Sequence, residues 1–159
     1  MKSINQWFSE YGESHQNSTN KLIHWICVPA IFYSIIGLLW SIPFPKLGLL
    51  PEPFDSFINV ATIISVFVLL FYLRLSFSIF IGIFFLILIG LIACYLIEQN
   101  VSTPLWLLSL GLFVFAWIGQ FYGHKIEGKK PSFLKDIQFL LIGPAWVIAF
   151  LYRKMNIRI

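Results

Sequence analysis

Charged side chains are scarce in this chain of 159 residues, where Asp, Glu, Lys and Arg together make up 11%. A soluble domain usually carries about 25%. With 58% hydrophobic residues, a chain of this size could not hide its apolar side chains from water, because small domains leave much of their surface exposed. Only two cysteines are present, which excludes a disulfide scaffold. The class that remains is an integral membrane protein.

The chain contains five long apolar runs, and they predict an all-α fold. Four of them, residues 24–42, 57–73, 77–97 and 104–123, contain 17 to 21 residues and no Asp, Glu, Lys or Arg. About 20 such residues suffice for a helix to cross the hydrocarbon core of a membrane. The fifth run, residues 137–152, is shorter and is interrupted by Gly143-Pro144. This run favours a re-entrant or interfacial segment.

The segment that precedes these runs predicts a short amphipathic helix. Its apolar residues recur at helical spacing, at Ile4, Trp7, Phe8 and Tyr11. Such a helix can lie along the membrane surface. We therefore expect a single integral membrane domain over residues 1–159: a polytopic helical bundle with four spanning helices, a re-entrant or interfacial fifth segment and an N-terminal amphipathic helix.

The distribution of lysine and arginine predicts the orientation of this bundle. With four crossings and a fifth segment that turns back, ten of the eleven Lys and Arg residues lie on one side, and only Lys46 lies on the other. Positive residues stay on the cytoplasmic side, so both termini are expected there. A bacterial inner membrane and the endoplasmic reticulum both satisfy the pattern, and the oligomeric state is open. No interleaving of basic and aromatic residues indicates a nucleic-acid partner.

The chain contains three histidines, and the parity of the crossings brings them to one membrane face. His15 lies in the N-terminal segment, His24 begins the first span and His124 ends the fourth. Asn20 and Gln120 each lie four residues before a histidine, on the same helical face. Because neutral imidazole is the commonest metal ligand, the three rings predict a site for Fe(II), Zn or Cu. Asn20 and Gln120 are expected to orient the ligands.

Other interpretations of these polar residues stay open. The histidines could be interfacial anchors of a non-catalytic lipid-binding membrane protein, or two of them could ligate a haem. Glu127 follows His124 by three residues, and it is either part of the site or a solvated partner of Lys129 or Lys130. The lysines at 125, 129 and 130 either face lipid headgroups or hold a substrate carboxylate.

The motifs around the histidines resemble a known family. One motif is YGESHQNSTNKLIHWICVP, residues 11–29, and the other is WIGQFYGHKIEGKKP, residues 117–131, followed by Gly143-Pro144. Both resemble the membrane-bound 2-hydroxy fatty acid dioxygenases known from yeast phytosphingosine breakdown. The resemblance covers nearly the whole chain.

This resemblance implies an Fe(II)-dependent enzyme whose iron is held by His15, His24 and His124. A 2-hydroxy fatty acid would react with O2, lose its carboxyl carbon as CO2 and become a fatty acid one carbon shorter. The acyl chain is expected between the first and fourth spans. Catalytic roles are predicted for Glu127, as a base beside the metal in preference to a fourth ligand, and for Lys125. Substrate contacts are predicted for Tyr11 and Lys129.

Overall fold

The computed structural model describes residues 2–128, 137–157 and 159, and the regular structure within them is helical. The α-helices are α1 (Ile4–Glu13), α2 (Ser18–Trp40), α3 (Val60–Leu75), α4 (Phe77–Asn100), α5 (Leu105–Glu127) and α6 (Ile137–Lys154). A short 3-10 helix, η1 (Phe54–Phe57), precedes α3. The predicted all-α fold is confirmed.

Polar residues mark where the helices begin. The first four α-helices each follow a Ser or Asn whose side chain accepts a backbone N–H of the first turn; these residues are Ser3, Asn17, Asn59 and Ser76. The end of α5 is set by Gly128, whose φ of 70° lies in the left-handed region that glycine adopts freely. The local sequence therefore sets these helix ends.

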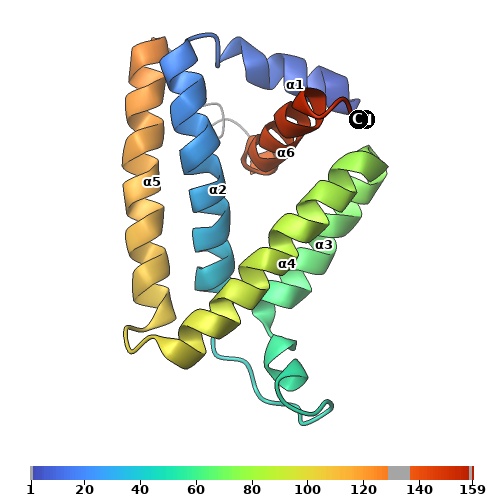
Figure 1. Cartoon of the computed structure of the whole chain (residues 1–159), viewed down its shortest axis with the longest axis vertical. Coiled ribbons are helices and arrows are strands. Elements are labelled where there is room, and N and C mark those ends of the chain that lie inside the picture. The colour runs from blue at the N-terminus through green and yellow to red at the C-terminus, as the bar shows by residue number, and fades with distance from the viewer. Residues whose placement is uncertain (1, 129–136, 158) are drawn as a thin grey trace.

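Two antiparallel helix pairs form the body of the molecule (Figure 1). Helices α2 and α5 pack along each other, and α3 and α4 form a second pair inclined to the first. Helix α4 crosses α2 closely at Gly90, where an added Cβ atom would lie 3.0 Å from atoms of both Tyr33 and Ile36. At the end of the bundle that carries the histidines, α1 lies across the top, and α6 lies beneath it beside α4.

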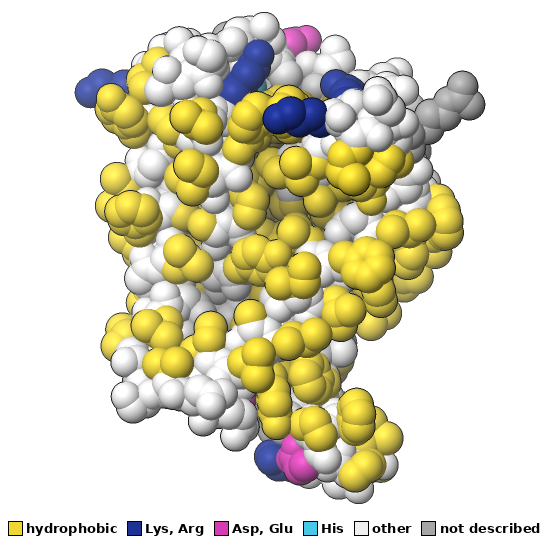
Figure 2. All heavy atoms as spheres, viewed as in Figure 1, with side chains coloured by type: hydrophobic (Ala, Val, Ile, Leu, Met, Phe, Trp, Pro, Cys, Tyr) yellow, Lys and Arg dark blue, Asp and Glu magenta, His cyan; other side chains and the backbone are white. Residues whose placement is uncertain are grey.

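Three helices, α2, α4 and α5, are long and apolar enough to cross a membrane. Helix α3 is also apolar but has 16 residues, and α6 is not among the three. The predicted count of four crossings is therefore supported for three helices and otherwise stays a prediction. Large apolar side chains cover the outer faces, such as Phe67, Phe115 and Ile118, and Figure 2 shows hydrophobic groups over the middle of one face with charged groups towards its ends. Such a distribution is compatible with a membrane protein.

The predicted N-terminal helix is present as α1, and its apolar residues Ile4, Trp7, Phe8 and Tyr11 are buried. Their partner is α6 and not the lipid surface that we expected. Trp7 meets the ring of Phe139 edge-on with 5.5 Å between centroids, and Tyr11 lies 5.6 Å from the ring of Trp146. Helix α6 remains at this end of the bundle in Figure 1, as a segment that turns back would. That it is re-entrant or interfacial, and does not cross the membrane, stays a prediction.

Candidate metal centre

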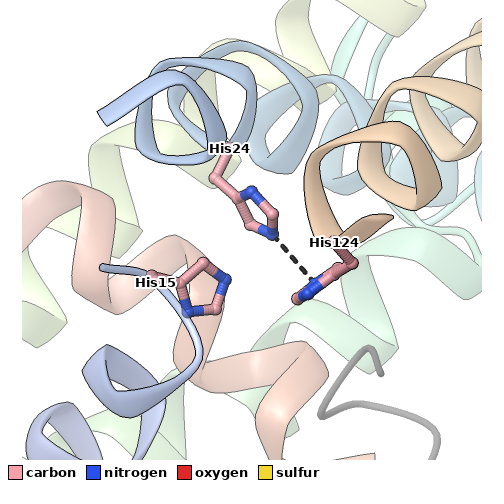
Figure 3. A group of neighbouring side chains, drawn as sticks. All are labelled: His15, His24 and His124. Carbon is pink, nitrogen blue, oxygen red and sulfur yellow. Dashed lines mark hydrogen bonds between the residues drawn. The ribbon is translucent and has the colours of Figure 1, made fainter. Parts of the chain in front are cut away.

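Three histidine rings meet at one end of the bundle. His15 lies in the turn between α1 and α2, His24 lies in α2, and His124 lies in the last turn of α5. All three are buried, with 4% exposure or less. Ring centroids are 4.2 Å apart for His15 and His24, 4.8 Å for His24 and His124, and 5.3 Å for His15 and His124. Figure 3 shows the rings turned toward one another. The convergence expected from crossing parity is thus present, and the role as metal ligands stays a proposal.

Two backbone carbonyls determine which ring nitrogens face this group. His15 Nδ1 donates to the carbonyl oxygen of Tyr11 at 2.5 Å, and His24 Nδ1 donates to that of Asn20 at 2.9 Å. A carbonyl oxygen only accepts, so each Nδ1 carries the proton and each Nε2 keeps a lone pair. The Nε2 atom of His15 is buried without a partner, and that of His24 lies 3.2 Å from His124 Nε2.

The positions of these nitrogens suit a cation. One ligand atom from each of the three rings lies within 4.8 Å of the other two. Burial lowers the pKa of His15, because desolvation penalises the charged ring; the nearby Glu127 carboxylate raises that pKa by less. The ring of His15 is therefore neutral near pH 7, which is the form that binds metals.

Glu127 links the turn before α2 to the end of α5. Its carboxylate accepts the backbone N–H of Gln16 at 2.7 Å and of Asn17 at 2.9 Å, and the side-chain amide of Asn20 at 2.9 Å. It is not among the grouped ligand atoms. These hydrogen bonds tie the turn that contains His15 to the end of α5, and the predicted role of Glu127 as a base beside the metal stays a prediction.

The two amides predicted to orient the histidines also differ from expectation. The Asn20 side chain donates to Glu127, and the backbone carbonyl of the same residue holds His24. Gln120 is buried and lines a cavity beside His124, with no hydrogen bond between these two side chains. The i, i+4 spacing correctly predicted that Asn20 lies close to His24. However, the backbone carbonyl of Asn20, and not its side chain, contacts the ring.

Substrate or catalytic roles were also predicted for Tyr11, Lys125 and Lys129, and their positions differ. Tyr11 stacks on His15 with ring centroids 4.2 Å apart, and it lines the same cavity. Lys125 is exposed and does not line that cavity, so its contacts give no support to a catalytic role. Lys129 lies outside the described residues.

A narrow cavity of about 190 Å³ begins at the three rings and extends along α2. Its wall is mainly apolar and includes Val28 and Ile31 of α2, Val68 of α3 and Ile87 of α4. Helix α6 contributes Phe139 to Leu141, Gly143 and Pro144. The sequence predicted an acyl-chain site between the first and fourth spans, and the structure adds walls from α3, α4 and α6.

Two glycines bring α5 close to α2 near the rings. A Cβ atom on Gly119 would lie 2.6 Å from Cys27 Sγ, and one on Gly123 would collide with Asn20 Oδ1. Any larger residue would therefore push His124 away from His24. The four-residue spacing of Gly119 and Gly123 is a sequence signal of close helix packing in membranes.

The features found are those of an apolar helical bundle whose buried histidine cluster, at the head of an apolar cavity, could hold a metal ion. Comparison with known proteins narrows this class. The model of the family described as 2-hydroxy-palmitic acid dioxygenase Mpo1-like matches residues 1–155. The 2-hydroxy-palmitic acid dioxygenase MPO1 of Saccharomyces cerevisiae is 30% identical over 142 residues, which cover 87% of this chain and 74% of the yeast protein. No solved structure matches. The chain belongs to the Mpo1-like family, which confirms the resemblance found in its motifs.

Proposed function

We propose that this protein is an Fe(II)-dependent dioxygenase that shortens 2-hydroxy fatty acids by one carbon. The observation that carries the proposal is the buried, unpartnered Nε2 of His15, which faces two further imidazoles at the head of an apolar cavity. The yeast relative, a 2-hydroxy-palmitic acid dioxygenase, supports the choice of reaction.

The residues fit a bound metal ion. Backbone carbonyls set the tautomers of His15 and His24 so that each Nε2 carries a lone pair. The Nε2 of His15 has no partner, and that of His24 is in hydrogen-bond contact with His124 Nε2. Imidazole donors suit Fe, Zn and Cu alike, so the choice of iron rests on the oxygen chemistry named in the relative. When bound, Fe(II) supplies the one-electron chemistry by which O2 reacts with an organic substrate.

The proposed reaction balances without a further reductant. A 2-hydroxy fatty acid and O2 give the fatty acid one carbon shorter, CO2 and water. The bond between C1 and C2 breaks, C2 becomes the new carboxyl carbon, and C1 leaves as CO2. The two carbons together lose four electrons, which is the number that reduces O2 to the oxidation level of water.

The residues of the chain bind and orient the substrate. The apolar cavity would take the acyl chain, with about 0.8 kcal/mol for each buried methylene. The carboxylate and 2-hydroxyl group would then remain at the histidine end, where Gln120 offers a buried amide and Tyr11 completes the wall. Holding both ends of the substrate fixes the bond between C1 and C2 beside the three rings.

Glu127 acts in this proposal as a positioning residue. Its three hydrogen bonds join the turn carrying His15 and the start of α2 to the end of α5. These are the three segments that supply the histidines. The carboxylate therefore holds the rings together without touching the substrate.

We place the site within a multi-pass membrane domain, with both termini and the histidine cluster on the cytoplasmic side. The segments on the side of the histidines carry nearly all of the Lys and Arg residues when the fifth segment turns back. A fatty acid could then enter from the bilayer while O2 and water reach the histidine end.

The test is iron content and product analysis on purified protein in lipid nanodiscs. We expect one iron per chain, O2 uptake with 2-hydroxypalmitate, and the saturated acid one carbon shorter as product. His124→Ala should lose iron and turnover together, while Ile126→Ala, an exposed neighbour on the same turn, should keep both. Retention of iron and activity by His124→Ala would overturn the assignment. Fatty-acid binding without metal or turnover in the wild type would instead favour a lipid-binding protein.

A further inference from the structure

On α2 the lining of the cavity ends at Leu39, and a group of packed aromatic rings follows directly beyond it. Trp40, the last residue of α2, meets Phe57 edge-on with 5.3 Å between centroids, and Phe57 lies 5.5 Å from the ring of Tyr95. The indole nitrogen of Trp40 donates to the carboxylate of Glu98 at 3.0 Å. We call Trp40, Phe57 and Tyr95 the aromatic floor. Its packing, together with the hydrogen bond, makes it a rigid boundary.

The depth of the cavity follows from the residues of α2 that line it. They run from His24 at the head to Leu39, the residue before Trp40. Fifteen helical steps of about 1.5 Å place Leu39 about 22 Å from His24 along the helix axis, and the floor begins at the next residue. An extended alkyl chain, with C–C bonds of about 1.5 Å and near-tetrahedral angles, advances about 1.25 Å per carbon. The depth therefore matches a chain of about sixteen to eighteen carbons.

We propose that the aromatic floor sets the upper limit on the acyl chain of the substrate. This inference rests on the proposed function, since it assumes that the carboxyl end stays at the three rings. Each methylene that enters the cavity strengthens binding about fourfold. Carbons beyond the floor find no apolar space along the axis, so they add no affinity and force the chain to bend.

Ser65 offers a way to move this limit. It is a small, buried residue of α3 that lines the lower part of the cavity. It lies five residues after Val60, where α3 begins just beyond the floor residue Phe57, or about 7.5 Å along the helix axis. A Phe side chain at this position would fill the last part of the cavity and shorten the accepted chain by about six carbons at about 1.25 Å per carbon.

Val66 provides the matched control. It is the next residue on α3, and it is 50% exposed on the outer face of the helix. Val66→Phe therefore introduces the same ring into the same helix without entering the cavity.

The experiment compares the wild type, Ser65→Phe and Val66→Phe in nanodiscs over 2-hydroxy acids of about 8 to 20 carbons, a range spanning the cavity depth. In the wild type, kcat/KM should rise with chain length and level off or fall beyond about eighteen carbons. Ser65→Phe should lose at least about 100-fold in kcat/KM with the sixteen-carbon acid and keep its value with ten carbons within about threefold. Val66→Phe should follow the wild type.

A second measurement separates failure of the floor from failure of the proposed function. Binding of saturated fatty acids over the same lengths, followed by native mass spectrometry, needs neither iron nor turnover, and it should show the same shift in preferred length. If no 2-hydroxy acid is converted by the wild type but binding shifts, the reaction is wrong and the floor stands. If folded, iron-loaded Ser65→Phe keeps the wild-type length preference in both assays, the floor is refuted.

Discussion

The two ends of the bundle differ in how many of their buried polar groups lack a hydrogen-bond partner. At the end with the aromatic floor, the indole of Trp40 donates to Glu98. The carboxylate of Asp55, itself buried, accepts the backbone N–H groups of Gly48, Leu49 and Leu50 at 3.0 to 3.4 Å. At the other end, four buried atoms have no hydrogen-bond partner: His15 Nε2, His124 Nδ1, Asn20 Oδ1 and Trp25 Nε1; near the floor end, Thr62 Oγ1 is the one such atom among the described residues.

This difference is what we expect if the floor end is structural and the histidine end binds a ligand, as proposed. A buried polar atom without a partner costs about 1–3 kcal/mol, and three of them gather around one small group of rings. At the floor end, the hydrogen bonds of Asp55 support the loop between α2 and α3. A ligand bound among the rings would give the unpaired histidine nitrogens the partners that they lack.

The largest expected effect comes from replacing an unpaired ring. His15→Phe keeps an aromatic ring against Tyr11 and removes the orphan Nε2, so metal binding should be lost completely, together with turnover. The metal-free protein should unfold at the same temperature as the wild type or a higher one, because an unsatisfied buried group is gone. Iron analysis and thermal unfolding of both metal-free proteins check this. A large fall in the unfolding temperature would show that the ring is a structural residue.

The next effect comes from the close contact of α2 and α5. Gly123→Ala should weaken metal binding by at least about tenfold and cost about 1–3 kcal/mol in stability, because the added methyl group overpacks against Asn20. Gly111→Ala, on the same helix, has nothing within 4 Å of the added atom, and it should be neutral or stabilise by up to about 1 kcal/mol. Iron titration and thermal unfolding of the pair measure both effects. Equal behaviour of the two variants would contradict the proposed packing constraint.

Glu127→Gln tests the link between the three histidine-bearing segments. Losing the charge should weaken its hydrogen bonds to the turn before α2 and lower metal affinity by about tenfold. The KM for the 2-hydroxy acid should change little, since the residue does not line the cavity. Glu10→Gln is the control, because its exposed ion pair with Lys2 contributes little. A loss of turnover in Glu127→Gln with full iron content would instead indicate the catalytic role predicted from the sequence.

The smallest expected effect on the metal site lies at the opposite end. Trp40→Phe removes the hydrogen bond to Glu98 and should lower stability by about 1–2 kcal/mol. Iron content and metal affinity should stay at the wild-type level, because the substitution lies about 22 Å from the rings along α2. Chemical unfolding and iron analysis measure the two quantities. Loss of iron in this variant would show that the two ends are coupled.

Much of the helical fold was predictable from local patterns, because an apolar run, a capping residue or a helix-ending glycine acts within a few residues. The apolar runs predicted α2 to α6 to within several residues, and the spacing of Ile4, Trp7, Phe8 and Tyr11 predicted α1. The partner of α1 was not predictable in the same way. A hydrophobic stripe has the same pattern whether lipid or α6 covers it.

The candidate site shows the same division at the level of single atoms. Parity of the crossings was enough to bring His15, His24 and His124 together, since it depends only on the order of the apolar runs. The contacts around them were not predictable, because Glu127 meets Gln16 and Asn17 only after two remote helix ends have packed against each other. Helix spacing gave the distance from Asn20 to His24 but not the choice between its side chain and its carbonyl group.

By itself, the amino-acid sequence determined that this protein is an apolar helical bundle with its three histidines at one end. These properties follow from hydropathy, helix periodicity and the counting of crossings, which need no knowledge of packing. Only the tertiary structure decided which ring nitrogens face one another, that α6 forms a wall of the cavity, and how deep that cavity is. Those features depend on contacts between segments far apart in the chain, and close packing, unlike helix formation, is a property of the whole set of side chains at once.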